Sequence, residues 1–217
     1  MDAESLIDAI KKGDEEAVRS AINSNAALAG ARDEAGISAV LTALYHRRKN
    51  LLEILLQAGP SLDGFESAAL GRPDLLLRLA VTKPDLATAW SPDGFTALHL
   101  ACFFGHLNAA LLLLNYEADV NAVSRNPMKV QPLHSAAADG KAAIVVLLLE
   151  RGADVNARQQ GGFTALHAAI HHANVEMAEI LLGYGADPSI KTTDGRTGIE
   201  MALEKGDRAV LRLLGIQ

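Results

Sequence analysis

The chain repeats one short pattern of residues at a nearly constant spacing. Gly-Phe-Thr-Ala-Leu-His-x-Ala occupies residues 94–101 and again 162–169, and variants of it occupy 129–136 and 195–202. The histidine of the pattern falls at His99, His134 and His167, and Glu200 takes its place in the last copy, so the intervals are 35, 33 and 33 residues. A period of this length predicts a stack of small repeated units.

The second half of each unit is repeated as well. Leu-Leu-Leu-Glu-Arg-Gly-Ala-Asp-Val-Asn-Ala at 147–157 is followed one period later by Ile-Leu-Leu-Gly-Tyr-Gly-Ala-Asp-Pro at 180–188. Together with Thr-Ala-Leu-His-x-Ala, these motifs resemble the ankyrin repeat, whose signature is Thr-Pro-Leu-His-x-Ala. The resemblance implies an all-α solenoid of helix–turn–helix repeats with short hairpin-like finger loops. It is specific over residues 92–217, and weaker echoes cover residues 1–91.

The weaker echoes determine the expected number of repeats. Gly-Ile-Ser-Ala-Val-Leu-Thr-Ala at 36–43 matches the first motif without its histidine. The next unit is shortened, lacks a turn motif in front of it, and begins its second helix at Pro73, a position that needs no N–H. We therefore expect a single ankyrin-repeat domain of seven repeats, the first and last acting as caps. The predicted boundaries are 1–33, 34–63, 64–91, 92–129, 130–160, 161–193 and 194–217.

Structural roles account for the repeated polar residues and glycines. Thr96 and Thr164 stand where a hydroxyl can cap a helix, and the histidine three residues later can hydrogen-bond to that turn and to the neighbouring repeat with both ring nitrogens. Gly152 fits a helix end that needs a left-handed residue. Glu117 takes the equivalent place one repeat earlier, so it either adopts that strained conformation or shifts the helix end. The finger at 123–130 has two extra residues and is expected to protrude.

The composition limits the classes of partner. The net charge of −6 and the pI near 5.6 argue against a polyanion-binding surface, and the basic run at 46–49 is too short to change this. The acidic start does not look like a secretory signal, and no apolar run reaches the roughly 20 residues of a membrane-spanning helix. The single cysteine, Cys102, is expected to be a buried, reduced thiol. We therefore expect a soluble cytoplasmic protein without a cofactor and without nucleic-acid or membrane partners.

His167, His171 and His172 provide the alternative to a pure binding function. Two histidines four residues apart on a helix can hold zinc, but no acidic or cysteine ligand has a matching spacing, and Glu176 falls on the following helix. The serine beside a histidine at 134–135 lacks the Gly-x-Ser-x-Gly elbow of a hydrolase. We expect no enzyme activity, and a metal-binding or hydrolytic protein that uses these three histidines stays open as the alternative.

Asn121 and Asn156 lie in Ala-Asp-Val-Asn-Ala contexts. The resemblance implies that such asparagines can be substrates of an asparaginyl hydroxylase in eukaryotic ankyrin proteins. A structural role is the other interpretation, because an asparagine here can hydrogen-bond to the backbone of its own turn. The sequence leaves both interpretations open.

Most of the chain's aromatic residues lie at positions that vary within ankyrin families. The resemblance implies that the two residues before the Gly-His pair of each repeat, and the residue between the finger glycine and the threonine, face a concave groove. Six of the nine Phe, Trp and Tyr residues lie at or beside these positions. With their polar neighbours they form the predicted partner-binding set: Tyr45, His46, Trp90, Phe95, Phe103, Phe104, Arg125, Asp139, Phe163, His171, His172 and Glu204.

Phe103 and Phe104 give this prediction its sharpest part. Adjacent helical residues cannot both point into one core seam, so at least one of these rings should be exposed. Phe95 and Phe163 can equally well pack against neighbouring fingers. Exposed aromatic rings at a concave surface are typical of interaction hot spots.

The expected function is the binding of a protein partner by a monomer through this groove. Its centre is expected at the phenylalanine pair together with His171 and His172, with Trp90 and the longer finger at the edge. The acidic Asp139 and Glu204 predict a partner of mixed apolar and basic character. A self-associating structural scaffold is the remaining alternative, since repeat arrays of this kind serve many functions.

Overall fold

The computed structural model describes residues 1–206 and 208–216. Asp207 and Gln217, which the sequence assigns to the last repeat, lie outside the described residues. The described residues form fourteen α-helices, and the only extended pairing among them is two isolated bridges, Arg32 with Ser38 and Lys191 with Thr197. The predicted all-α class is confirmed.

The helices follow one another in short pairs along the chain. They are α1 (Ala3–Lys12), α2 (Glu15–Ser24), α3 (Ala39–Tyr45), α4 (Lys49–Gln57), α5 (Gly64–Ala69), α6 (Pro73–Thr82), α7 (Ala97–Phe104), α8 (Leu107–Asn115), α9 (Pro132–Ala138), α10 (Ala142–Glu150), α11 (Ala165–His171), α12 (Val175–Gly183), α13 (Gly198–Lys205) and α14 (Arg208–Leu213). Two 3₁₀-helices, Ala26–Gly30 and Gln160–Gly162, lie in the connections.

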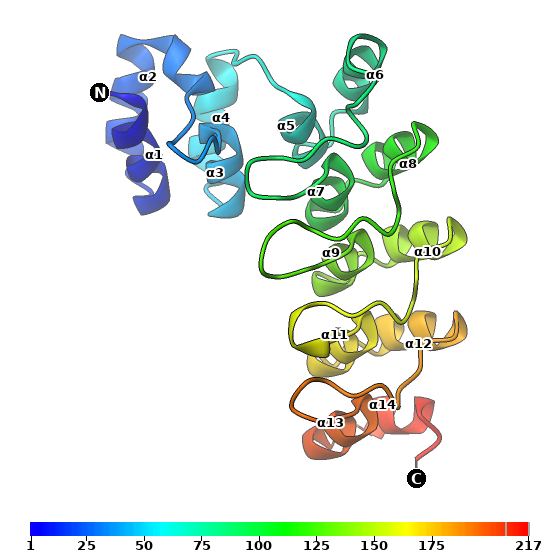
Figure 1. Ribbon diagram of the computed structural model, residues 1–217. Coiled ribbons are helices and arrows are strands. Elements are labelled where there is room, and N and C mark those ends of the chain that lie inside the picture. The colour runs from blue at the N-terminus through cyan, green and yellow to red at the C-terminus, as the bar shows by residue number, and fades with distance from the viewer. Residues whose placement is uncertain (207, 217) are drawn as a thin grey trace.

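The pairs stack into a two-layered solenoid that bends near its N-terminal end. Each odd-numbered helix packs on the next one from α1 to α13 and forms the inner layer. In the outer layer α2 packs on α4, and α6 to α14 pack in succession, but α4 and α6 make almost no contact. Figure 1 shows the consequence, because α5 to α14 stack in one direction while α1 to α4 turn aside. The bend lies at the third unit, which the sequence predicts to be shortened.

The hydrophobic core is divided at the same place. A smaller cluster contains buried side chains of α1 to α4, from Leu6 to Leu55, and a larger cluster runs from Leu41 in α3 to Val210 in α14. Leu44 packs against both clusters. Burial therefore accumulates between neighbouring helix pairs, as expected of a solenoid.

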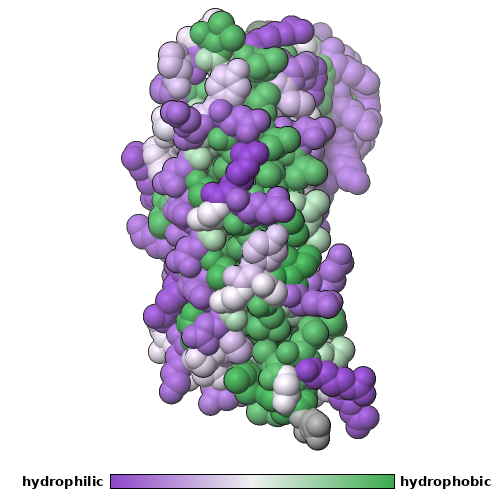
Figure 2. All heavy atoms as spheres, turned by 90° about the vertical axis from the view of Figure 1, so that its right-hand side faces the viewer, coloured by the Kyte–Doolittle hydropathy of each residue, from purple (hydrophilic) through white to green (hydrophobic). Residues whose placement is uncertain are grey.

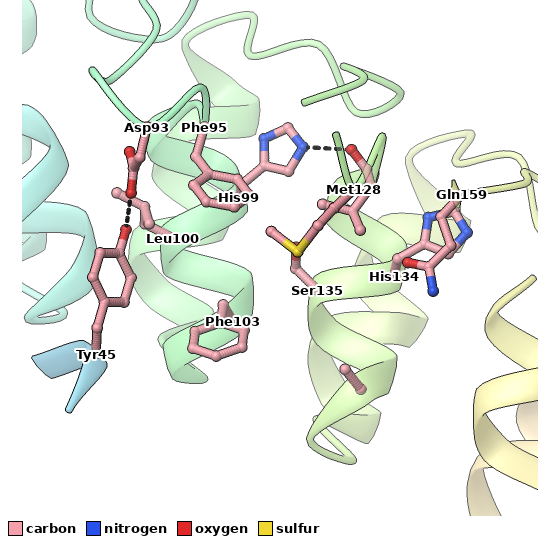
Figure 3. A pocket seen from close by; sticks show the side chains of 12 residues that line it. Tyr45, Asp93, Phe95, His99, Leu100, Phe103, Met128, His134, Ser135 and Gln159 are labelled. Carbon is pink, nitrogen blue, oxygen red and sulfur yellow. Dashed lines mark hydrogen bonds between the residues drawn. The ribbon is translucent and has the colours of Figure 1, made fainter. Parts of the chain in front are cut away.

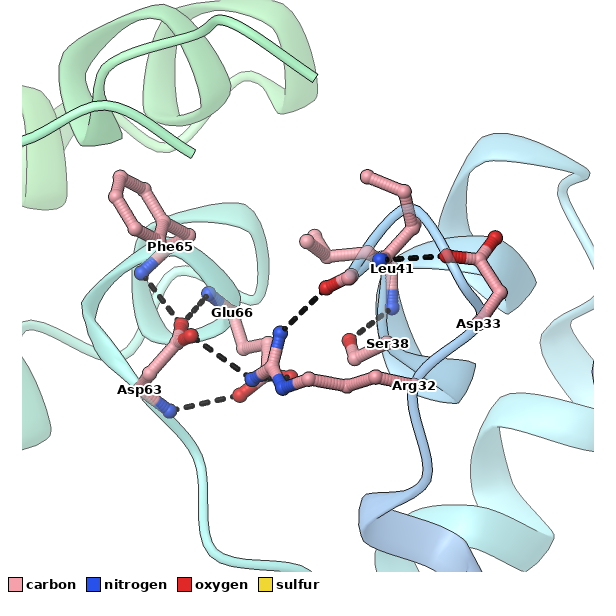
Figure 4. Close-up of polar contacts among 9 residues, drawn as sticks. Arg32, Asp33, Ser38, Leu41, Asp63, Phe65 and Glu66 are labelled. Atoms are coloured by element: carbon pink, nitrogen blue, oxygen red, sulfur yellow. Dashed lines mark hydrogen bonds and ion pairs between the residues drawn. The ribbon is translucent and has the colours of Figure 1, made fainter. Parts of the chain in front are cut away.

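Arg32 connects the two sides of the bend (Figure 4). Its guanidinium donates from Nη1 to the Gly36 carbonyl over 3.1 Å and from Nη2 to Asp63 Oδ2 over 2.9 Å and Glu66 Oε1 over 3.1 Å. Glu66 is buried, and its other carboxylate oxygen accepts from the Asp63 N–H over 2.7 Å. Asp63 in turn accepts from the Glu66 N–H over 3.0 Å, which completes a capping box that begins α5. This turn was not predicted, although Asp-x-x-Glu at residues 63–66 is its signal.

The repeated histidines tie each helix start to the next repeat. His99 Nδ1 accepts from the Thr96 N–H over 3.2 Å, and its Nε2 lies 3.1 Å from the Val130 carbonyl oxygen. His134 bonds in the same way to the Gln131 N–H and to the Ala157 carbonyl. The prediction is wrong for one nitrogen of His167. Its Nδ1 accepts from the Thr164 N–H over 3.1 Å, but its buried Nε2 makes no hydrogen bond to the part of the chain that the structure describes.

Burial keeps these rings neutral. Loss of solvent lowers the pKa of His99 to about 4, and the carbonyl of Val130 opposes this shift only in part. Burial also lowers the pKa of His134 and that of His167 below the ordinary value. In the same core, burial raises the pKa of the Cys102 thiol, which is fully enclosed as the sequence predicts.

The two turn asparagines bond across repeats rather than within their own turn. Asn121 donates from Nδ2 to the Gly152 carbonyl over 3.1 Å, and its Oδ1 accepts from the Asp154 N–H over 2.9 Å. Asn156 makes the same pair of bonds with Gly185 and Asp187 in the next unit. The expected bond to the residue's own turn is therefore wrong, because one period of stacking brings the following loop within reach.

Glu117 adopts the strained left-handed conformation, which is one of the two arrangements that the sequence predicts for it. It follows α8 with φ 64°, whereas the glycine in the same place of the next unit, Gly152, has φ 85°. A side chain in this left-handed region costs about 1–2 kcal/mol relative to glycine. The helix end therefore stays in register with the other units at the expense of local strain.

The outer helices carry apolar as well as polar side chains on their solvent side (Figure 2). Leu77 and Val81 of α6 are exposed, and so are Leu107 and Leu111 of α8. Within the described part of the chain, none of the helices has the length and apolar character needed to cross a membrane.

Candidate functional site

A cavity of about 470 Å³ opens on the inner layer between α7 and α9 and is covered by the fingers in front of them (Figure 3). Its apolar walls come from separate repeats, since Tyr45 lies at the end of α3, Leu100 and Phe103 lie on α7, and Ala138 ends α9. Met128 reaches the cavity from the longer finger at 123–130. The stacking of inner helices thus creates a hollow that no single repeat contains.

The Tyr45 ring is fixed at one end of this cavity. Its hydroxyl donates to Asp93 Oδ2 over 2.6 Å, and its ring stacks on Phe104 with the centroids 5.9 Å apart. Burial and the adjacent Asp93 carboxylate both raise the pKa of Tyr45 above its ordinary value. The other oxygen of Asp93 accepts from the Ser91 hydroxyl, so this carboxylate is already held by two donors. The cavity therefore has a rigid wall with its polar atoms paired.

Phe103 and Phe104 take different environments, as predicted. Phe103 is 41% exposed at the mouth of the cavity, whereas Phe104 is half-buried and packs against the larger core cluster. The two rings meet edge to face with their centroids 5.1 Å apart. Phe103 is thus an exposed ring held in position by Phe104, the kind of side chain that can anchor a partner at little cost in conformational entropy.

The aromatic residues of the fingers mainly pack within the molecule. Phe95 lies against His99 and Phe163 against His167, each with ring centroids 5.8 Å apart. Phe95 also lines the cavity, but Phe163 does not. Both rings therefore pack within the molecule on the histidine of their own repeat, and Phe95 combines this packing with a place at the groove.

Trp90 and Arg125 form one contact at the edge of the fingers. The Arg125 guanidinium carbon lies 4.4 Å from the centroid of the Trp90 ring, which is a cation–π distance. The backbone N–H of Arg125 donates to the Gly94 carbonyl over 2.8 Å, and Asn126 Nδ2 donates to the Asp93 carbonyl over 3.0 Å. The longer finger is therefore fastened to the finger before it, which places Met128 over the cavity.

A second cavity of about 530 Å³ adjoins the first and is basic. Tyr45 and Phe103 line both cavities, and Phe104 lines the second. The ionisable residues of the second cavity are Arg47, Arg48, Lys49, Lys141 and Asp139. Asp139 is already paired, since its carboxylate lies 2.9 Å from the Lys141 ammonium.

The remaining predicted residues lie away from these two cavities. His171 and Glu204 line a smaller cavity of about 290 Å³, where Glu204 lies 3.6 Å from Arg196 and the Lys205 ammonium donates to the His171 carbonyl. His172 packs edge to face against His171, with the ring centroids 5.0 Å apart. Neither His172 nor His46 lines any of the three cavities. The structure therefore does not bring the histidine pair and the phenylalanine pair into one hollow.

The arrangement of His167, His171 and His172 gives no metal centre. His167 is buried and uses Nδ1 to hold the start of α11, while its two neighbours are exposed. Among the described side chains no group of three His, Cys, Asp or Glu residues is placed to hold a metal ion.

Sequence reasoning missed several residues of the groove. Met128 lies in the finger with two extra residues, and that insertion was the available signal. Asp93 and Leu100 carried no signal, because their place in the cavity depends on the stacking of three repeats. Arg47 and Lys49 belong to the basic run that the net charge led us to set aside.

The comparison with known families agrees with the repeats seen in the fold. Residues 65–159 and 133–216 match the family described as ankyrin repeats in three copies. The matched region begins in α5 and extends past α14, so it includes most of the larger core cluster, whose first member, Leu41, lies before it. The chain belongs to the ankyrin-repeat family.

Proposed function

We propose that this chain is a non-enzymatic module that binds a protein partner in the groove formed by Tyr45, Phe95, Phe103, Phe104 and Met128. Ankyrin repeats are generally protein–protein interaction modules. The observation that carries the proposal is the exposed Phe103 ring at the mouth of a mainly apolar cavity, in which the Tyr45 hydroxyl is already paired with Asp93. Such a hollow with an aromatic rim favours an apolar anchor from a partner.

Seven repeats with the predicted boundaries remain part of the proposal. The helix pairs support that division, because α1 with α2 and α13 with α14 stand at the two ends. We propose that a longer interface has outer contacts at His46, Trp90, Arg125, Asp139, Phe163, His171, His172 and Glu204.

The test compares two exposed aromatic side chains. Phe103 and Tyr116 are 41% and 43% exposed, but Tyr116 follows α8 in the outer layer and is not in the groove. Phe103→Ala should weaken binding of a captured partner about tenfold or more, and Tyr116→Ala should leave it unchanged. The single substitution is preferable to a change of both phenylalanines, because Phe104 packs against the core. Equal affinities of the folded Phe103→Ala variant and the wild type would contradict the proposal.

Self-association is the second candidate function, and the outer helices favour it. Val81 is 77% exposed and Leu77 is 48% exposed on α6. Surface apolar residues of this kind can support contacts between copies. We propose a monomer, which light scattering over a concentration series tests directly. If the measured mass rises with concentration to that of two chains, and Val81→Glu returns it to the mass of one chain, the scaffold function would be favoured instead.

A further inference from the structure

Two cavities of opposite character share one wall in the groove. The apolar cavity over α7 and α9 and the basic cavity over α3 and α7 are both lined by Tyr45 and Phe103. Their volumes are about 470 and 530 Å³, within the range of roughly 300–1,000 Å³ that is usual for ligand pockets. A single extended segment that crosses Phe103 would therefore contact both.

The basic cavity contains more positive charge than its surroundings can balance. Four basic side chains line it against one carboxylate, that of Asp139, although the whole chain has a net charge of −6. Asp139 is paired with Lys141, and Arg48 Nη2 donates to the Lys11 carbonyl over 3.0 Å. Within the described residues neither Arg47 nor Lys49 has an ion pair, and both are exposed. These two cations thus lack an acidic partner among the residues that the structure describes.

The apolar cavity, in contrast, has little to offer a charged ligand. The nitrogens of His99 face Thr96 and Val130, and those of His134 face Gln131 and Ala157. The Asp93 carboxylate accepts from Tyr45 and Ser91. Ser135 and Gln159 add only neutral polar groups to this lining, so a charged side chain placed there would lose its hydration without gaining a free opposite charge, whereas an apolar side chain would gain from burial.

We infer that the partner segment carries an apolar or aromatic anchor beside one or more acidic residues, with the anchor in the cavity over α7 and α9 and the carboxylates at Arg47 and Lys49. The inference rests on the proposed function and names its partner class. It replaces the expectation of a basic partner, because the acidic residues behind that expectation are paired. Asp139 lies against Lys141, and Glu204 lies against Arg196 in a separate cavity.

The test uses a displayed library of random peptides selected on the full-length chain. The enriched peptides should carry Asp or Glu beside a large apolar residue. Arg47→Glu with Lys49→Glu should weaken their binding about tenfold or more. The matched control is Arg78→Glu with Lys83→Glu, which makes the same change of charge at exposed positions of α6 and directly after it and should have little effect. Ala138→Trp, at an exposed residue that lines the apolar cavity, should abolish binding by filling it.

Each contrary result separates the inference from the proposed function. Peptides without acidic residues, or with unchanged affinity for the Arg47→Glu and Lys49→Glu variant, would overturn the inference. If those peptides still lost affinity for Phe103→Ala, the groove would remain the binding site. Insensitivity to both Phe103→Ala and Ala138→Trp would overturn the proposed function as well. A selection that enriches no peptide overturns the inference. The inference would also be overturned by a single-stranded oligonucleotide that binds more tightly than the peptides and whose affinity is unchanged by Ala138→Trp. Such a result would assign the basic cavity to nucleic acid.

Discussion

The His106 imidazole lies directly over Gly71, so that a Cβ added to Gly71 would come within 2.3 Å of His106 Nδ1. The ring cannot easily move aside, since its Nε2 lies 3.0 Å from the Ala69 carbonyl oxygen. Gly71 separates α5 from α6, and His106 precedes α8. Similar contacts place Arg48 over Gly13 and Lys141 over Gly105. Residues in front of outer helices therefore cover the glycines that end inner helices one repeat earlier.

Gly71→Ala should destabilise the chain by about 2–4 kcal/mol, through left-handed strain and the collision with His106. The control is Gly152→Ala, where φ is 85° but an added Cβ meets no atom within 4 Å. Strain alone acts there, so the expected loss is about 1 kcal/mol. Urea unfolding followed by circular dichroism measures both. Equal losses would show that the contact with His106 is unimportant.

Replacement of Glu117 by glycine should raise stability. Glu117 is exposed and has φ 64°, so Glu117→Gly relieves strain and removes few contacts. The expected gain is about 0.5–1 kcal/mol, less than the full strain because glycine also makes the unfolded chain more flexible. Glu150→Gly, at the last residue of α10, should instead lower stability by about 0.5–1 kcal/mol. A thermal melt of both variants decides the matter, and a lower melting temperature for Glu117→Gly would contradict the account.

Arg32→Met should weaken the junction between the two core clusters. The substitution leaves the buried Glu66 carboxylate without its cation, which lies 3.1 Å away in the native chain. We expect a loss of about 1–2 kcal/mol, less than for a fully buried pair because Arg32 is 37% exposed. Arg72→Met, which removes the exposed pair with Asp74, should have little effect in the same denaturation experiment. If both variants matched the wild type, the ion pairs of Arg32 would not hold the bend.

Stability should fall as the pH is lowered from 6.5 towards 4. Burial places the pKa of folded His99 at about 4, below its ordinary value of 6.5, and also lowers the pKa of His134 and of His167. Between these pH values the unfolded chain binds protons that the folded chain does not, so the stability present above pH 6.5 is lost on acidification. For His99 alone the loss approaches about 3 kcal/mol. Melting temperatures across this range provide the measurement, and His99→Gln should flatten the slope relative to the wild type. A stability that stayed constant from pH 7 to pH 5 would contradict the burial of the neutral rings.

The sequence predicted the parts of the fold that depend on a local pattern. The interval between His99, His134 and His167 indicated the solenoid, and the adjacent Phe103 and Phe104 indicated one exposed ring. The bend, the bonds of Arg32 and the cross-repeat bonds of Asn121 were not predicted. They join residues about one period apart, and a repeat motif does not report how far a neighbouring loop reaches.

The candidate site could be predicted only in part for the same reason. Tyr45, Phe95 and Phe103 stand at variable repeat positions and do line the groove. The basic cavity escaped prediction because Arg47 and Lys49 come from the second repeat and Lys141 from the fifth, while only the total charge is visible in the sequence. The pairing of Asp139 with Lys141 and of Glu204 with Arg196 was likewise not visible in the sequence, because each pair depends on how the chain folds.

Methionine methyl NMR tests the central claim most directly, because the four methionines report on different places. Met128 lines the apolar cavity and is 47% exposed, whereas Met1 is 58% exposed at the start of the chain. Met177 and Met201 are buried in the larger core cluster. A partner or selected peptide, titrated into the methyl-labelled chain, should shift the Met128 resonance and leave that of Met1 in place. An unchanged Met128 resonance at saturation would contradict binding in the groove.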